Sequence, residues 1–247
     1  MNADPAVQIR LLDLQAVDTT LSRLAHRRAT LPELAEIELG DQNLAALRDD
    51  VVRAETRLRD LGREQRRLEA DVDQVRQRAS RDQQRMTSGA VGSPKELERL
   101  QHEVDTLARR QAELEDQVLE VMEQHEKAEG DLSELRSRMD QVAADRDDAV
   151  ARRDRAHAEI DAERADATAE RDQLATEIPE DLSALYERIR SSSGGVGAAA
   201  LRQRRCEGCR LELAGTELTA ARTAPPDAVL RCENCGRILV RIPESGL

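Results

Sequence analysis

Two long stretches of the chain carry apolar residues at alternating spacings of three and four, which is the pattern of a coiled-coil seam. This spacing gathers the apolar side chains on one stripe of each helix, where they pack against a second helix. The sequence therefore predicts two helical arms joined along one seam. The first arm contains Leu44, Leu47, Val51, Ala54, Leu58, Leu61, Gln65, Leu68, Val72, Val75 and Ala79, and the second contains Leu97, Leu100, Val104, Leu107, Gln111, Leu114, Val118, Val121, His125, Ala128, Leu132, Leu135, Met139 and Val142.

A short break separates the two arms at residues 87–92. The next helix then has a strong start signal, with Ser93 as N-cap, Pro94 at the first helical position and Glu96 completing a capping box. Two arms of similar length joined by a short turn predict an antiparallel coiled-coil hairpin over residues 1–178.

The register of this hairpin follows from the position of its turn. Antiparallel arms folded at the turn predict that Leu68 lies near Leu114. Pro32 and Gly40 interrupt the first arm, so a kink or short break is expected between residues 30 and 42. The alternative to a self-paired hairpin is that each arm pairs with another chain.

The composition excludes a large globular core. The chain has no Phe or Trp and a single Tyr, and 36% of its residues are charged. Long helices have this profile, and the sustained heptads argue against disorder. The formal charge of −12 is uneven, because residues 201–247 carry eight Arg and six acidic residues while the remainder carries −14. Acidic helices repel phosphate, so nucleic-acid contact is expected only from the C-terminal part.

Four cysteines, all within the last 42 residues, form two C-x2-C pairs: Cys206 with Cys209, and Cys232 with Cys235. Each pair presents two thiolates, and two pairs complete the tetrahedral sulfur shell that is typical of one structural Zn²⁺ ion. A redox pair is the alternative, but neither pair stands in the βαβ pattern of a thioredoxin-like site. None of the four histidines lies near a cysteine pair, so an all-thiolate site is predicted.

The fold class is therefore mainly α, with a long antiparallel coiled-coil hairpin followed by a small C-terminal β zinc ribbon. The ribbon is expected at residues 198–247, after a short helix and linker at residues 179–197, with strands at residues 217–220, 229–231 and 237–242. A module of under 50 residues buries too little surface to fold alone. Zinc is expected to contribute about 10 kcal/mol or more to its folding.

Two sets of residues are candidate binding surfaces. Arginines of the ribbon would form a phosphate-binding face, although six acidic residues are interspersed and the ribbon has no aromatic residue to stack a base. Apolar residues near the N-terminus face small and charged residues at 158–168, so the segment around Tyr186, the ribbon or a partner is expected to cover them. The candidate nucleic-acid contacts are Arg202, Arg204, Arg205, Arg210, Arg231, Arg237 and Arg241, and the candidate docking or partner residues are Leu14, Val17, Leu21, Leu24 and Tyr186.

The chain resembles a bacterial family of C4-type zinc-ribbon proteins with a long N-terminal coiled-coil hairpin. The resemblance rests on the order of parts, on Ser93-Pro-Lys-Glu-Leu-Glu-Arg-Leu-Gln-His-Glu-Val104, on Tyr186, and above all on Cys232-Glu-Asn-Cys235-Gly-Arg-Ile-Leu239. Members are commonly labelled nucleic-acid-binding zinc ribbons. A relative in some flagellated bacteria is a regulator that binds an alternative sigma factor and a flagellin message. The resemblance implies that the four cysteines hold zinc, and it implies no catalytic residue.

The sequence thus favours a non-enzymatic zinc-binding adaptor or regulator that acts through protein–protein contacts of the coiled coil and the ribbon. The alternative is an RNA- or DNA-binding protein acting through the arginines of the ribbon. The N-terminus has no signal pattern and no apolar run approaches 18 residues, so a soluble, cytoplasmic protein is expected, without membrane contact and as a monomer or homodimer.

Overall fold

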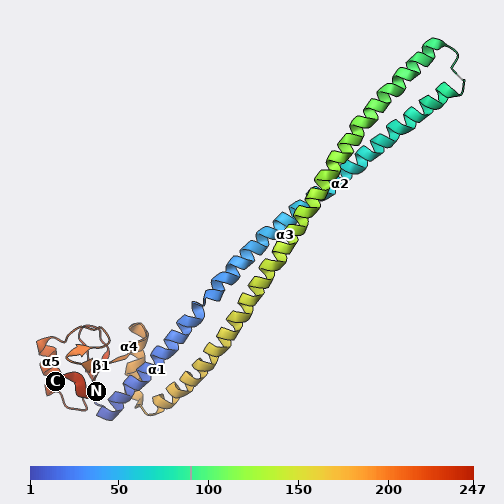
Figure 1. Ribbon diagram of the computed structural model, residues 1–247. Coiled ribbons are helices and arrows are strands. Elements are labelled where there is room, and N and C mark those ends of the chain that lie inside the picture. Colours follow the sequence, from blue (N-terminus) through green and yellow to red (C-terminus); the bar gives the residue numbers. More distant parts are fainter. Residues whose placement is uncertain (90) are drawn as a thin grey trace. The chain divides into compact units, whose positions relative to one another are not determined.

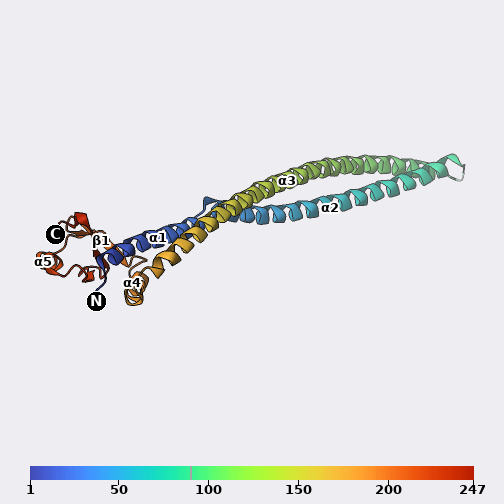
Figure 2. The ribbon, with the colours of Figure 1, turned by 90° about the horizontal axis from the view of Figure 1, so that it is seen from below.

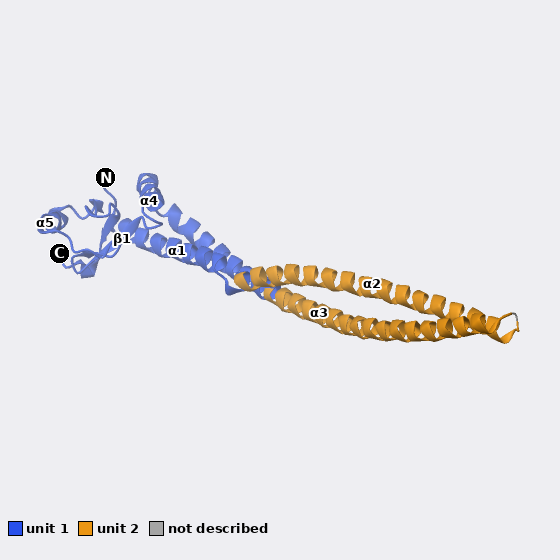
Figure 3. Ribbon diagram, turned by 90° about the horizontal axis from the view of Figure 1, so that it is seen from above, with its two compact units in different colours: residues 1–34, 150–247 blue, residues 35–149 orange. Residues whose placement is uncertain are grey.

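Figure 1 shows the computed structural model, which describes residues 1–89 and 91–247. Ala90, within the turn predicted at residues 87–92, lies outside the described residues. The chain forms two compact units, one made of residues 1–34 and 150–247 and the other of residues 35–149 (Figure 3). Each unit has its own packed interior, and the two are described in turn.

The unit of residues 35–149 is an antiparallel helical hairpin. Its arms belong to helices α2 (Pro32–Thr87) and α3 (Pro94–Thr176), which run side by side in both views (Figures 1 and 2). The predicted seam forms its core, and Leu68 and Leu114 lie in one apolar cluster as predicted. Ion pairs join the arms on either side of this seam, and they include Arg85 with Glu96, Arg76 with Glu115, Glu55 with Arg136, and Asp41 with Arg146.

The expected break in the first arm is confirmed, but Gly40 does not contribute to it. Helix α1 (Pro5–Ala29) ends just before Thr30, and α2 begins at Pro32. Gly40 lies inside α2, and a Cβ atom added to it would lie 2.9 Å from the Cβ of Arg146. The glycine therefore lets two helices approach closely. The sequence alone does not distinguish a glycine with this role from one that breaks a helix.

The other unit combines α1, the last part of α3, helix α4 (Glu180–Ser192) and the ribbon. The ribbon sheet has the strand order β2-β1-β4-β3, with β1 parallel to β4 and both outer strands antiparallel to their neighbours. The first residues of the chain also join the ribbon, because Ala3 N–H donates to Asp227 O at 2.8 Å and Val229 N–H donates to Met1 O at 3.2 Å. The remaining elements are β1 (Ala198–Arg202), β2 (Arg205–Cys206), α5 (Gly215–Thr223), β3 (Leu230–Arg231), β4 (Ile238–Arg241) and the 3₁₀ turn η1 (Pro243–Ser245).

The strand predicted at residues 217–220 is wrong, because this segment is part of helix α5. Glu217 and Ala221 are the buried residues of α5, and their spacing of four is that of a helix face. Contact with the rest of the ribbon decides the structure of such a short segment, whose local preference is weak. The strands expected at 229–231 and 237–242 correspond to β3 and β4.

Among the described residues, no helix combines the length and the apolar character needed to cross a lipid bilayer.

Candidate metal centre and its attachment

The two cysteine pairs lie in turns with the same backbone hydrogen bonds. In the first turn, Cys206 N–H donates to Leu211 O at 3.0 Å, and Arg210 N–H donates to Cys206 O at 2.6 Å. The second turn repeats both bonds, from Cys232 N–H to Arg237 O at 3.0 Å and from Gly236 N–H to Cys232 O at 2.8 Å. Two equivalent turns thus face each other, each bringing two sulfurs to the same point.

The sulfur positions fit a tetrahedral zinc ion. The four Sγ atoms all lie within 4.8 Å of one another. Cys206 Sγ is 3.8 Å from Cys235 Sγ, and Cys209 Sγ is 3.9 Å from Cys232 Sγ. Zinc–sulfur bonds of about 2.3 Å in a tetrahedron separate the sulfurs by about 3.8 Å. The donor set and its dimensions therefore match one structural Zn²⁺ ion.

The charge state of these thiols depends on burial and on nearby N–H groups. Burial raises the pKa of the Cys206 thiol to about 12, against the lowering effect of the Cys209 and Gly208 N–H groups. Burial also raises the pKa of Cys232. At Cys235, burial acts to raise the pKa, but the Arg237 N–H and further hydrogen bonds outweigh it and the pKa is lowered. Since zinc binds thiolates, metal binding would release protons from the site.

Arg210 and Gly236 occupy the same position in the two turns, and both have a left-handed backbone, with φ of 63° and 72°. A side chain in this conformation costs about 1–2 kcal/mol, whereas glycine adopts it without strain. The first turn therefore contains strain that the second avoids.

We expect Arg210→Gly to stabilise the zinc-bound ribbon by about 0.5–1 kcal/mol, because relief of strain exceeds the added chain entropy of glycine. Gly236→Ala is the matched control and should destabilise the ribbon by about 1–2 kcal/mol. Thermal unfolding of the zinc-loaded protein measures both effects. Equal changes in the two variants would contradict the assignment of strain to Arg210.

Glu217 is a buried carboxylate next to the second cysteine pair, and the sequence analysis assigned it no role. It is 7% exposed, and its Oε1 accepts a hydrogen bond from Glu233 N–H at 2.9 Å. Its Oε2 is also buried and has no hydrogen-bond partner among the described residues. Because Glu233 follows Cys232 directly, this bond fixes the backbone that presents the Cys232 sulfur. Glu217 was predicted to lie in a strand, and nothing in the sequence indicated that its carboxylate contacts the second cysteine turn.

Glu217→Ala should weaken zinc affinity by about 10–100-fold, as is typical when a group that orients metal ligands is lost. Glu217→Gln keeps an acceptor for the Glu233 N–H and should recover most of that affinity. Competition with a chromophoric chelator measures the zinc affinity of both variants. An alanine variant with unchanged affinity would show that Glu217 does not position the metal ligands.

Most of the candidate nucleic-acid contacts bind the ribbon itself. Arg237 donates to the carbonyl oxygens of Ser193, Val196 and Gly208 at 2.9–3.2 Å. Arg241 donates to five carbonyl oxygens of the loop at residues 221–228. Both side chains therefore hold loops of the protein together.

The other five arginines are all exposed. Arg231 and Arg204 each donate to a carbonyl oxygen, of Gly236 and Gly246, and Arg202 lies 3.9 Å from a carboxylate oxygen of Glu207. Arg205 and Arg210 make no side-chain hydrogen bond or ion pair with any residue in the described ranges.

The apolar residues near the N-terminus are covered within their own unit. Leu14, Val17 and Leu24 are buried, and Leu21 is half-buried. Leu14 belongs to a core cluster shared by α1, α4 and the ribbon, in which Tyr186 is fully buried. The other buried members of this cluster are Leu11, Ile178, Leu182, Ile189, Ala198, Ile238 and Val240. The ribbon is thus packed on α1 and α4 through a continuous apolar interior.

A polar network centred on the buried Asp18 lies beside this cluster. The Asp18 side chain is 1% exposed, and its Oδ1 accepts a hydrogen bond from Arg171 Nε at 2.7 Å. Its Oδ2 accepts one from the Tyr186 hydroxyl at 2.6 Å and lies 3.5 Å from Arg190 Nε. Glu187 accepts hydrogen bonds from both arginines. The carboxylate of Asp18 raises the pKa of Arg171, and burial followed by the bond to Asp18 raises the pKa of Tyr186.

Gln15 extends this network to the chain that leads into β1. Its Oε1 accepts a hydrogen bond from Gly197 N–H at 2.7 Å, and its Nε2 donates to Gly195 O at 3.1 Å. A Cβ atom on Gly197 would lie 2.7 Å from the ring of Tyr186, so only glycine fits there. Asp18 and Gln15 border the apolar stripe of α1 in the sequence, but that pattern does not show that they are buried.

These features define a class of protein: a four-cysteine zinc ribbon packed on helices α1 and α4, in a chain that also forms a helical hairpin. Residues 14–194 match the CT398-like coiled coil hairpin domain, and residues 205–239 match the C4-type zinc ribbon domain. The chain belongs to this family of hairpin proteins, which confirms the hairpin, the ribbon and the structural zinc ion predicted from the sequence.

Mycobacterial proteins are among the similar sequences. The chain is 38% identical to the protein MT2288 of Mycobacterium tuberculosis, over 98% of both chains. It is 32% identical to the protein ML1638 of Mycobacterium leprae, over 91% of this chain and 96% of that one.

Solved structures with the same fold include proteins from two further bacteria. One from Mycobacterium smegmatis has a TM-score of 0.85 at 37% identity, covering 98% of this chain and all of that one. The structure of CT398 from Chlamydia trachomatis has a TM-score of 0.70 at 19% identity, covering 96% of this chain and 98% of that one, and so shows a shared fold.

Proposed function

We propose that the protein is a non-enzymatic adaptor or regulator that joins protein partners through its helical hairpin and its zinc ribbon. In this proposal it works in the cytoplasm, where thiols stay reduced and available to zinc. The observation that carries the proposal is the attachment of the ribbon to α1 and α4, through the buried cluster around Tyr186 and the network around Asp18. A ribbon fixed in this way presents its surface in a constant orientation to α1.

The chemistry of the metal centre agrees with a role without catalysis. Four thiolates fill the coordination shell of a structural zinc ion, and a catalytic zinc ion keeps one position open for water or substrate. The Glu217 carboxylate next to the centre holds backbone through Glu233 N–H.

Nucleic-acid binding is the second candidate function, and one observation favours it. Arg202, Arg204, Arg205 and Arg210 are all exposed and follow one another along β1, β2 and the first cysteine turn. Cations clustered in this way attract phosphate. The adaptor ranks first because Arg237 and Arg241, which were predicted to lie on the same face, bind backbone carbonyls of the ribbon instead.

A pull-down from a bacterial lysate, with and without nuclease, separates the two functions. The intact protein would be compared with a Cys232→Ser/Cys235→Ser variant, which loses the ribbon, and with an Arg205→Ala/Arg210→Ala variant, which keeps it. We expect one defined protein that survives nuclease, requires the cysteines and is captured equally by the arginine variant. The sigma factor and the message implied by the family resemblance fall into the two classes that this experiment distinguishes.

Recovery of nucleic acid alone would reverse the ranking. Such binding should fall steeply with salt and be lost in the Arg205→Ala/Arg210→Ala variant. Arg48→Ala/Arg57→Ala, on the exposed surface of α2, is the matched control for a general change of charge.

A further inference from the structure

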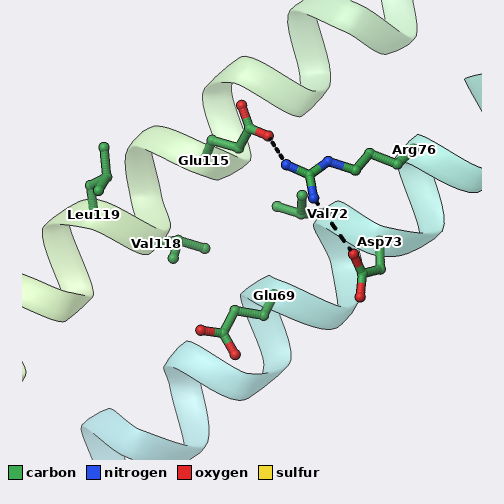
Figure 4. Close-up of a pocket in the computed structure, with 7 residues that line it drawn as sticks. All are labelled: Glu69, Val72, Asp73, Arg76, Glu115, Val118 and Leu119. Carbon is green, nitrogen blue, oxygen red and sulfur yellow. Dashed lines mark hydrogen bonds and ion pairs between the residues drawn. The ribbon is translucent and has the colours of Figure 1, made fainter.

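A shallow groove runs between α2 and α3 in the unit of residues 35–149 (Figure 4). Val72 and Val118 line it with apolar surface, and the exposed Leu119 stands at its edge. Its polar residues are Glu69, Asp73, Arg76 and Glu115. Arg76 Nη2 is 2.6 Å from Glu115 Oε1, and Nη1 is 3.9 Å from Asp73 Oδ1, so this one cation is already paired within the groove.

The exposed apolar residues beside the groove are not explained by packing of the hairpin. Leu119 is 58% exposed and Met122 is 45% exposed. The seam of α3 passes through Leu114, Val118 and Val121, which face α2 and are buried or half-buried. Leu119 and Met122 are three residues apart, which places them together on the outer face of α3.

Acidic residues surround these two apolar side chains. Asp116, Glu120, Glu123 and Glu126 are all exposed. Asp116, Glu123 and Glu126 lie three or four residues from Leu119 or Met122 and are their neighbours on the helix surface, while Glu120 lies in the next row, one turn from Asp116 and Glu123. None of the four makes a hydrogen bond or ion pair through its side chain with a residue in the described ranges. The segment of residues 113–134 has nine acidic residues and one Lys, so its charge is not balanced locally.

We propose that this surface, made of Leu119, Met122 and the four acidic residues around them, together with the groove, binds a cationic amphipathic helix of a partner protein. The inference deepens the proposed adaptor function and rests on it. A helix lays its apolar stripe into a groove of this kind, and Lys or Arg on either side of the stripe pairs with the acidic residues. Charge complementarity selects a basic partner over an acidic one.

Binding of synthetic peptides to the full chain tests this proposal directly. The probe is a fluorescent helical peptide with Lys and Arg on both sides of a leucine stripe. Its comparison peptides are a scrambled version of the same composition and a version with Glu in place of the cations. We expect the first to bind, and its affinity to fall by about tenfold or more in Leu119→Gln/Met122→Gln, because two apolar contacts are lost.

Two further variants define the contribution of charge and of position. Glu123→Gln/Glu126→Gln should weaken binding and reduce its dependence on salt. Leu39→Gln/Val52→Gln changes two equally exposed apolar residues elsewhere in the same unit and should leave the affinity unchanged. Equal binding of the scrambled peptide, equal binding by Leu119→Gln/Met122→Gln, or preference for the Glu peptide would overturn the proposal.

The surface could instead bind a second copy of the chain, and sedimentation velocity tests this alternative. Self-association that disappears in Leu119→Gln/Met122→Gln would assign the surface to a dimer and overturn the proposal of a basic partner. The pull-down described above tests the adaptor function separately from the proposed binding site on the hairpin. If the nuclease-resistant partner is captured equally by this variant, the adaptor function stands and the groove is not its binding site.

Discussion

Removal of zinc is expected to unfold the ribbon and to leave the hairpin helices folded. Structural zinc contributes about 10–16 kcal/mol to small metal domains, more than the net stability of most whole proteins. The ribbon has short strands and one short helix around the metal, whereas the hairpin has its own apolar cluster around Leu68 and Leu114. Loss of the ribbon would also uncover Leu11, Leu14 and Tyr186, which it buries.

Two optical signals measure these outcomes separately. When a chelator removes zinc, the helical circular dichroism signal should lose only a small part of its magnitude. The fluorescence emission of Tyr186, the single Tyr in a chain without Trp or Phe, should change because its ring becomes exposed to water. Cys232→Ser/Cys235→Ser should give the same spectra without chelator, and added zinc should reverse the change only in the intact protein. A metal-free protein with unchanged Tyr186 emission would contradict this expectation.

Asp18→Ala is expected to destabilise the unit that contains the ribbon by about 2–3 kcal/mol, because a hydrogen bond to a charged group contributes about 1.5–3 kcal/mol. The substitution removes the nearest acceptor of the buried Tyr186 hydroxyl and leaves the partly exposed Arg171 guanidinium with Glu187 alone. Urea unfolding followed by Tyr186 emission measures the change in the free energy of unfolding.

Two control variants test whether the effect belongs to the buried network. Tyr186→Phe removes the hydroxyl that contacts Asp18 Oδ2 at 2.6 Å and Gln15 Oε1 at 3.2 Å, and it should cost about 1–2 kcal/mol, measured by circular dichroism. Asp41→Ala breaks the exposed pair with Arg146 in the hairpin and should cost about 1 kcal/mol or less. A cost for Asp18→Ala as small as that of Asp41→Ala would mean that the network does not hold the unit together.

The hairpin and the metal site could be predicted from the sequence because each has a local, periodic signal. The seam repeats over many turns, so misinterpreting one residue such as Gly40 does not change the prediction of a hairpin. The cysteines have fixed spacings that one metal ion explains. Both signals depend only on residues close to each other in the chain.

The junction between α1, α4 and the ribbon has no such signal. Asp18 meets Arg171 and Tyr186, and Gln15 meets Gly197, across more than 150 residues of sequence. A polar residue beside an apolar stripe is usually exposed, so burial of these two had no local sign. Helix α5 was missed for a related reason, because its buried face is defined by contact with the second cysteine turn through Glu217.

The pairing of the first residues with the ribbon has a consequence for synthesis of the protein. Met1, Ala3 and the leucines of α1 leave the ribosome long before their partners Asp227, Val229 and β4. Until then, the apolar stripe of α1 lacks its final cover and is open to chaperones or to aggregation. Formation of the hairpin shortens the effective loop that must close, so early folding of α2 with α3 would speed the packing of the ribbon on α1.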